Sequence, residues 1–265
     1  MALLQINCFA KSLRRKTQIT VIIPTDAPPE IAPNLPERFK PIYLLHGFSE
    51  DHTAFLAGAP LQEYACRYGA AFIMPSGENS FYLNDGIRGA LYEEYICLEL
   101  PEIAAKFLPI SDKREDTVVA GISMGGFGAI HSGLAHPEKF GAIISYSAAL
   151  ITDGISTMKE GDSNPVAPYS YYRHTFGDLT RLPGSRNDPK ALAAALPPED
   201  APNIYMCCGT EDFLLNENRD FHETLVRLGI AHTYAEDSGT HDWAFWNRFI
   251  PRSLDWLEDQ RRNRC

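Results

Sequence analysis

Short apolar runs alternate with amphipathic stretches along most of the chain, beginning near residue 41. The apolar runs have the length and composition of strands that are buried on both faces of a sheet. We expect strands at 41–45, 70–74, 118–122, 140–147, 204–208 and 231–235, and helices at 60–68, 90–107 (with a kink or break at Pro101), 124–135, 213–228 and a last one opened by residues 239–243. This alternation predicts an α/β fold, a mostly parallel sheet with helices on both faces.

The first 41 residues follow a different pattern. Residues 2–10 and 17–23 are strand-like runs joined by a basic turn, which predicts an antiparallel hairpin at one edge of the sheet. The stretch 24–41 is rich in proline and acidic residues and is expected to be a surface connection. An exposed apolar edge of the sheet would support a homo-oligomer.

Residues 148–200 are the irregular part of the chain, with Gly, Ser, Asn and Pro throughout and a helix expected at 188–196. A long insertion at the carboxyl edge of a parallel sheet is typical of a cap over a substrate site, and plain surface packing is the alternative. No repeat or low-complexity tract interrupts the chain. We expect one domain, 1–265, with 148–200 as its cap.

Composition and charge narrow the class of protein. The chain has 265 residues, 45% of them hydrophobic, which suits one large domain. A formal net charge of -10 disfavours nucleic acid and anionic membranes as partners. We find neither an apolar run of membrane-spanning length nor a secretory signal. The six cysteines show no C-x-x-C spacing, which favours free thiols in a cytoplasmic protein without a metal or other cofactor.

One stretch carries a recognisable chemistry. Residues 121–125 read Gly-Ile-Ser-Met-Gly, between an apolar strand and a helix of small residues. This is the G-x-S-x-G nucleophile elbow in its expected context. The elbow holds Ser123 in a strained conformation above the sheet, and Gly121 and Gly125 make room for it. The alternative is a Gly-rich turn in which Ser123 only caps the helix.

A serine nucleophile needs a base, and the base needs an acidic partner that fixes its tautomer. The carboxyl ends of parallel strands share one edge of the sheet, and Ser123, Asp212 and His241 all fall there. Their order along the chain is that of the α/β-hydrolase triad. We therefore assign His241, which lies between a strand and a helix, as the base and Asp212 as the acid.

Other residues compete for these two roles. His52 and His174 lie in loops and are rivals of His241. Glu211 is the neighbouring rival of Asp212, and an aspartate before a helix is often only its N-cap. We favour Asp212 because the shorter acid at the strand exit is the commoner third member of such triads.

The tetrahedral intermediate of acyl transfer needs two backbone N–H donors for its oxyanion. The N–H of Met124, directly after the nucleophile, is the first expected donor. The loop that follows strand 41–45 begins His-Gly-Phe, so the second is expected from the N–H of Phe48. Since the loop has no HGGG motif, this second donor belongs to a bulky residue.

Four segments together resemble the esterase D-like branch of the α/β-hydrolases: 46–48, 121–126, 209–212 and 241–246 (His-Asp-Trp-x-x-Trp). The resemblance extends from about residue 5 to residue 257. It is strongest for the bacterial tributyrin esterase and acetyl esterase group, whose relatives include S-formylglutathione hydrolases, cinnamoyl (feruloyl) esterases and mycolyltransferases.

The resemblance implies an α/β-hydrolase fold and a carboxylesterase that cleaves short acyl esters, from acetyl to butyryl. It carries the catalytic roles onto Ser123, Asp212 and His241, and the oxyanion donors onto Phe48 and Met124. It requires no cofactor and no metal. The small-molecule ester is the only partner that it implies.

The substrate pocket is less defined by the sequence. The resemblance implies that Trp243 lies beside the acyl or alcohol pocket, and a core aromatic on the last helix is the alternative. Aromatic residues at 81–82 and 169–176 favour an acetylated or feruloylated sugar and add Tyr82 to the expected pocket. S-formylglutathione hydrolases carry a Ser-Gly-Leu-Thr-Cys-type sequence where residues 46–50 read His-Gly-Phe-Ser-Glu, which disfavours their substrate.

Two other functions remain open at this stage. A thioesterase or acyltransferase would use the same triad, and acyl transfer to added alcohols or thiols would reveal it. An inactive binding protein with a hydrolase fold would not react with a fluorophosphonate probe. The esterase mechanism itself predicts that turnover rises through roughly pH 6 to 7.5, because the base must be neutral.

Overall fold

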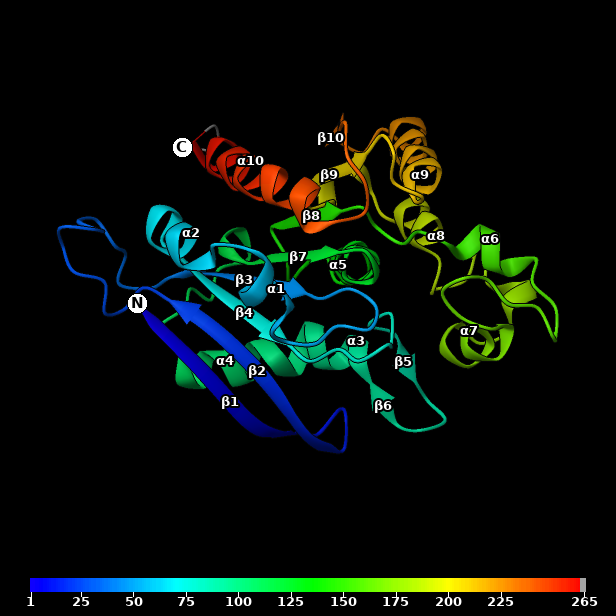
Figure 1. Cartoon of the computed structure of the whole chain (residues 1–265), viewed down its shortest axis with the longest axis horizontal. Helices are drawn as coiled ribbons and strands as arrows, with labels where there is room; N and C mark the ends of the chain where they lie inside the picture. The colour runs from blue at the N-terminus through cyan, green and yellow to red at the C-terminus, as the bar shows by residue number, and fades with distance from the viewer. Residues whose placement is uncertain (263–265) are drawn as a thin grey trace.

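The apolar runs form one eight-stranded sheet, and the computed structural model describes residues 1–262 (Figure 1). Its strands are β1 (Ala2–Ala10), β2 (Arg15–Ile23), β3 (Lys40–Leu45), β4 (Ala70–Pro75), β7 (Val118–Ile122), β8 (Ala142–Tyr146), β9 (Asn203–Gly209) and β10 (His232–Asp237). Their order across the sheet is β1-β2-β4-β3-β7-β8-β9-β10. Only β1 with β2 and β2 with β4 pair antiparallel, so the expected mostly parallel sheet with an antiparallel N-terminal edge is confirmed.

Helices cover both faces of this sheet. The helices of the described residues are α1 (Ala54–Gly58), α2 (Leu61–Tyr68), α3 (Tyr92–Glu94), α4 (Leu100–Phe107), α5 (Met124–Ala135), α6 (Thr152–Ser156), α7 (Tyr169–Phe176), α8 (Pro189–Ala195), α9 (Leu215–Leu228) and α10 (Trp243–Arg262). Ile42 and Leu44 of β3 pack in the cluster beneath α2 and α10, whereas Tyr43 and Leu45 pack with α4, α5 and α9. Successive side chains of β3 therefore point to opposite faces of the sheet, and each face has its own hydrophobic core.

The predicted helix 90–107 is not regular. It runs as α3, then a π-helical turn at Tyr95–Glu99, then α4. Pro101 has no N–H to donate to the preceding helical turn, and it comes directly after the π-helical turn and Leu100. The irregularity thus falls in the turn before Pro101, and the N–H of Leu100 bonds to the carbonyl of Tyr95.

Residues 76–89 are a polar and aromatic stretch that the pattern predicts to be loop, and this prediction is wrong at the end of the segment. Two short strands, β5 (Asn84–Asp85) and β6 (Ala90–Leu91), form a separate hairpin. The side chain of Asp85 accepts hydrogen bonds from the N–H groups of Ile87 and Arg88, which closes the turn. This local turn chemistry has no hydrophobic period, so pattern analysis does not detect it.

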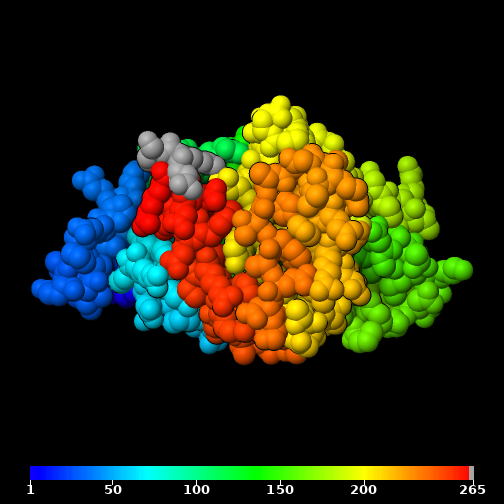
Figure 2. Space-filling view, turned by 90° about the horizontal axis from the view of Figure 1, so that it is seen from above, coloured from blue at the N-terminus to red at the C-terminus, as the bar shows by residue number. Residues whose placement is uncertain are grey.

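The segment 148–200 contains α6, α7, the predicted α8, and two 3-10 turns at Leu179–Arg181 and Pro198–Asp200. Another 3-10 turn, Arg114–Asp116, precedes β7. The segment lies at the opposite end of the molecule from the 24–39 connection (Figures 1 and 2). Within residues 1–262, no helix combines the length and the apolar character needed to cross a membrane.

Candidate active site

Ser123 sits in a sharp turn between β7 and α5, with φ 56° and ψ -118°. A Cβ at position 121 would lie 2.2 Å from the carbonyl oxygen of Gly125, and one at position 125 would lie 1.9 Å from that of Leu45. Both contacts are impossible for a side chain, so glycine is required at both positions. The left-handed φ of a non-glycine residue is a strained conformation that the surrounding structure must hold in place.

Backbone hydrogen bonds hold the turn. The N–H of Ser123 donates to the carbonyl of Tyr146 at 3.0 Å, and the Ser123 carbonyl accepts from the N–H groups of Phe127 and Ala149 at 3.0 and 2.9 Å. The elbow is therefore tied to β8 and to the residues that follow β8. These contacts fix where the serine hydroxyl lies relative to the sheet.

Asp212 and His241 form a hydrogen-bonded pair at the carboxyl edge of the sheet. Nδ1 of His241 lies 2.9 Å from Oδ2 and 3.1 Å from Oδ1 of Asp212. The Asp212 side chain is fully buried and also accepts the N–H of Leu214 at 2.9 Å. Burial alone would raise the pKa of this carboxyl, but the hydrogen bonds from His241 and Leu214 outweigh it and lower the pKa. An ionised Asp212 therefore holds the proton of His241 on Nδ1 and leaves Nε2 free to accept.

The loops that carry this pair approach each other closely. A Cβ on Gly209, at the end of β9, would lie 2.1 Å from the carbonyl oxygen of Gly239. The His241 ring packs between the rings of Phe213 and Trp246, with centroids 4.7 and 5.1 Å away. Phe213, which directly follows Asp212, was not identified from the sequence, and Trp246 was named only as part of the 241–246 motif.

The competing residues have other partners. Glu211 accepts from the N–H of Gly239 at 2.5 Å, so it shapes the turn rather than contacting His241. His52 bonds to Thr20 and Gln18, and His174 bonds to Asp85. The structure thus pairs Asp212 with His241 and places the rivals elsewhere.

His46 orients the loop that carries Phe48. Its Nε2 accepts the N–H of Gly77 at 2.9 Å, so the ring proton is on Nδ1, which donates to the carbonyl of Gly47 at 2.8 Å. Burial lowers the pKa of His46, which keeps the ring neutral. The 47–48 peptide bond is trans, so the N–H of Phe48 points away from the carbonyl that His46 holds. Within residues 1–262 that N–H has no hydrogen-bond partner.

A cavity of about 680 Å³ brings the candidate residues together. Ser123, Met124, Phe48 and His241 all line it. Its other walls come from Ser49, Phe81, Ala149, Ile151, Asn164, Pro165, Val166, Tyr172, Phe213, Leu214 and Glu217. The segment 148–200 thus contributes one wall of the cavity, and that wall is mostly apolar.

Two expected pocket residues lie outside this cavity. Tyr82 is fully buried, and its hydroxyl donates to the carbonyl of His46 at 3.0 Å. Trp243 packs edge-on against Phe55 and Trp246, with ring centroids 5.3 and 5.2 Å away. Tyr82 therefore supports the loop of Phe48 from below, and Trp243 is a packing residue of α10.

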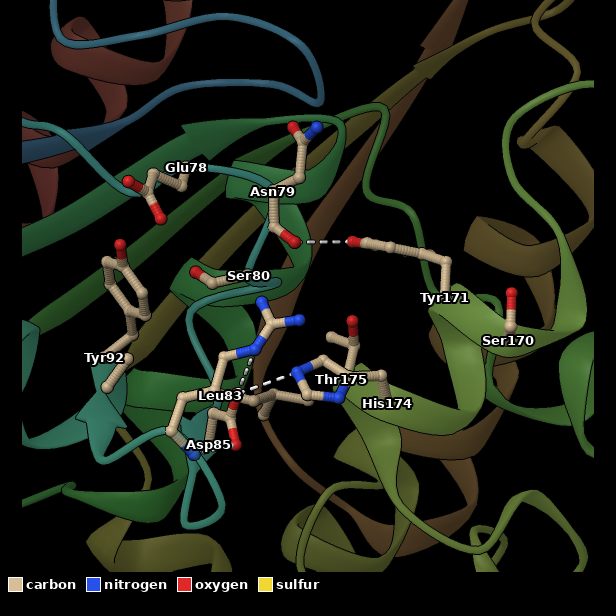
Figure 3. A pocket seen from close by; sticks show the side chains of 12 residues that line it. Glu78, Asn79, Ser80, Leu83, Asp85, Tyr92, Ser170, Tyr171, His174 and Thr175 are labelled. Atoms are coloured by element: carbon tan, nitrogen blue, oxygen red, sulfur yellow. Dashed lines mark hydrogen bonds and ion pairs between the residues drawn. The ribbon is translucent and has the colours of Figure 1, made fainter.

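A second, more polar cavity of about 580 Å³ lies beside the first, between the 78–92 region and α7 (Figure 3). Figure 3 shows Tyr171 pointing toward Asn79, whose carbonyl accepts the tyrosine hydroxyl at 2.6 Å. The Asn79 side chain accepts the N–H of Ser49, and the Tyr171 ring contacts Phe48. These residues separate the two cavities and brace the 46–49 loop.

Known proteins are similar to this chain along nearly its whole length. A model of the family described as "Putative esterase" matches residues 10–257. An acetyl esterase of Caldicellulosiruptor saccharolyticus is 42% identical over 261 residues, which cover 97% of this chain and 98% of that protein. Two solved structures from Staphylococcus aureus align with 97% of this chain, and the alignment includes 98% of each of those proteins. They are a fluorophosphonate-binding serine hydrolase, FphF (29% identity, TM-score 0.83), and an S-formylglutathione hydrolase, FrmB (28% identity, TM-score 0.81).

Proposed function

This chain belongs to that esterase family, and we propose that it hydrolyses short-chain carboxylic esters through an acyl-enzyme formed on Ser123. As a member of the family it is a serine-type carboxylic ester hydrolase. The observation that carries the assignment of residues is the Asp212–His241 pair, whose histidine lines the same cavity as Ser123.

In the proposed mechanism the Ser123 hydroxyl attacks the ester carbonyl while Nε2 of His241 takes its proton. Asp212 stabilises the resulting imidazolium. The N–H groups of Phe48 and Met124 donate to the oxyanion. His241 then gives the proton to the departing alcohol, and a water molecule activated by the same histidine releases the acid.

The proposed substrates are esters of acetyl to butyryl groups, and acetylated or feruloylated sugars are proposed among the substrates. The apolar walls of the cavity and the similarity to an acetyl esterase support the short acyl group. The tyrosines of α7 support a sugar, either acetylated or feruloylated, because Tyr172 lines the cavity and Tyr171 contacts Phe48. A thioester is the second candidate substrate, since an S-formylglutathione hydrolase shares the fold along nearly the whole chain.

The test is hydrolysis of p-nitrophenyl acetate, butyrate and octanoate by the wild type and by Ser123→Ala. We expect turnover of the short esters, and a loss of about a million-fold in kcat for the variant. Circular dichroism should show both proteins folded. Retained activity in Ser123→Ala would contradict the proposal, and faster cleavage of the matching thioesters would favour the second candidate.

We also propose a cytoplasmic location and self-association. Cys8, Cys66, Cys97, Cys207 and Cys208 form no disulfide, which supports a reducing compartment. Leu3 and Phe9 are exposed on β1, the edge strand, which supports a homo-oligomer. Alkylation of the thiols in intact cells and light scattering of the purified protein test these two points.

A further inference from the structure

Two cavities lined mostly by polar and charged residues adjoin α7. The first, of about 580 Å³, is the one between the 78–92 region and α7, and the second, of about 560 Å³, lies between α7 and residues 160–163. Ser170 and His174 line both of them, so we treat the two cavities together as the α7 groove. Each part alone has the volume of a site for a small molecule.

The α7 groove borders the catalytic cavity. Consecutive residues of α7 divide between the two, since Tyr171 lines the groove and Tyr172 lines the catalytic cavity. The ring of Phe48, in the catalytic cavity, lies 5.4 Å from the Tyr171 ring, and the N–H of Ser49 donates to the Asn79 side chain at 2.7 Å. One layer of contacting side chains therefore separates the groove from the catalytic cavity, and a substrate longer than a simple short ester could occupy both.

The groove offers accessible hydrogen-bond donors and acceptors close together. Arg88 is 72% exposed, and within the described residues only its Nε faces a carboxylate, that of Asp85 at 3.8 Å, which leaves its terminal nitrogens as donors. Glu78 is 56% exposed and pairs with Arg15 through Oε1, and a carboxylate can accept several hydrogen bonds at once. Figure 3 shows Glu78 and Ser170 on opposite sides of the first cavity, and the Ser170 hydroxyl can both donate and accept.

This mixture of groups discriminates between classes of ligand. An anion would be repelled by Glu78, and a cation would be repelled by Arg88. A neutral molecule with many hydroxyl groups suits both, because each hydroxyl can donate to a carboxylate and accept from a guanidinium. Tyr169 and Tyr171 add amphipathic rings to the groove, which suit the C–H face and the hydroxyl edge of a sugar.

We propose that the α7 groove binds a neutral sugar chain that carries the ester, while the acyl group lies in the catalytic cavity against Ser123. The chain passes over the contact between Asn79 and Tyr171, which separates the two sites. The proposal rests on the proposed function, because the sugar chain is the alcohol of the ester that Ser123 cleaves. It assigns to the groove the part of the substrate that lies beyond the scissile bond.

The experiment compares esters that differ only in the length of the sugar chain. The substrates are singly acetylated oligosaccharides of glucose, xylose or mannose, with one to four units. The readout is the ratio of kcat/KM for each sugar ester to kcat/KM for p-nitrophenyl acetate, which has no sugar. Ser170→Trp puts a bulky ring into the groove at an exposed position, and Arg88→Ala removes a donor without adding bulk. The control is Thr157→Trp, at an exposed residue of the 148–200 segment that lines neither the groove nor the catalytic cavity.

We expect the wild-type ratio to rise about 10- to 100-fold from one unit to four for at least one of the sugars, because contacts remote from the scissile bond add to transition-state binding. Ser170→Trp should remove most of this rise, and Arg88→Ala should remove part of it. Thr157→Trp should keep the whole rise. Thermal melts establish that each variant is folded, and Arg88→Ala carries the test if Ser170→Trp is not.

A ratio that does not change with chain length for any of the three sugars, with hydrolysis that still depends on Ser123, would overturn the role of the groove and leave the proposed function standing. A rise that survives unchanged in both Ser170→Trp and Arg88→Ala would also overturn it, since the sugar chain would then bind elsewhere. Faster cleavage of acetylated uronic-acid oligomers than of neutral ones, lost in Arg88→Ala, would mean that the groove binds carboxylates and would overturn the neutral sugar. Absence of any Ser123-dependent ester hydrolysis would instead overturn the proposed function.

Discussion

At this site, hydrogen bonds to the backbone and to a carboxylate decide which ring nitrogen of each histidine carries the proton. A backbone N–H fixes the acceptor nitrogen of His46, and an ionised carboxylate fixes the donor nitrogen of His241. The two rings end with the same tautomer but with different tasks. His46 uses both nitrogens on the backbone, whereas Nε2 of His241 stays available for the proton transfer that we propose.

We expect Asp212→Asn to fold like the wild type and to lose about 10,000-fold in kcat, with little change in KM. The amide would present an N–H to His241 and favour the tautomer with its proton on Nε2, which cannot accept the serine proton. Steady-state kinetics with p-nitrophenyl acetate measures this loss. A loss smaller than tenfold would show that the pair is only structural.

We expect His46→Ala to lower kcat about 10- to 100-fold, because the Gly47 carbonyl would lose its donor and the N–H of Phe48 its fixed direction. In His46→Asn the amide N–H can take the place of Nδ1 and should restore most of kcat. KM should change little in both variants. If kcat and stability fall together and asparagine restores neither, His46 acts only through packing.

At the scale of secondary-structure elements, the features that steric contacts require can be predicted well from the sequence. The elbow and the parallel strands follow from glycine spacing and apolar runs, and the α/β-hydrolase fold expected from the resemblance is confirmed. Asp212 and His241 were chosen from their order along the chain at the strand ends, and their side chains form a hydrogen-bonded pair. Side-chain direction within a loop has no comparable signature. Tyr82 could therefore not be placed beneath its loop, nor Glu217 in the cavity, before the structure was known.

The elbow itself gives a prediction with an internal control. Gly125→Ala would put a Cβ 1.9 Å from the Leu45 carbonyl oxygen, whereas Gly154→Ala, in α6, meets nothing within 4 Å. We expect Gly125→Ala to lose about 3 kcal/mol of stability or more, and its activity with it. Gly154→Ala should keep both. Urea unfolding followed by circular dichroism measures the difference, and equal stability of the two variants would contradict the close approach of β3 and α5.

At the scale of the whole molecule, the 148–200 segment is tied to the body by a buried charge. Glu93 of α3 is 3% exposed and contacts His136, after α5, and Arg186 of the segment. The carbonyl of Arg186 also lies 3.1 Å from Nε2 of His131. One carboxylate thus joins α3, α5 and the segment that forms a wall of the catalytic cavity.

The pH dependence of folding should reveal this carboxylate. Burial alone would raise the pKa of Glu93, but its hydrogen bonds to His136 and Arg186 outweigh it and lower the pKa from 4.5 to about 2. A lowered pKa means that the ionised form stabilises the fold. Its contribution is therefore present above about pH 4.5 and is lost as the pH falls toward 2. Because Arg186 is largely exposed, we expect about 1–3 kcal/mol rather than the full value of a buried pair.

Glu93→Gln should accordingly be less stable than the wild type by about 1–3 kcal/mol at pH 7, and the two proteins should converge in stability as the pH falls from 4.5 to 2. Thermal melts across that range, with Glu94→Gln as the exposed neighbouring control, measure the difference. If the gap stays constant with pH, the carboxylate contributes through packing alone. If it closes while the activity of Glu93→Gln at pH 7 also falls, the charge that holds the segment in place also shapes the wall of the catalytic cavity.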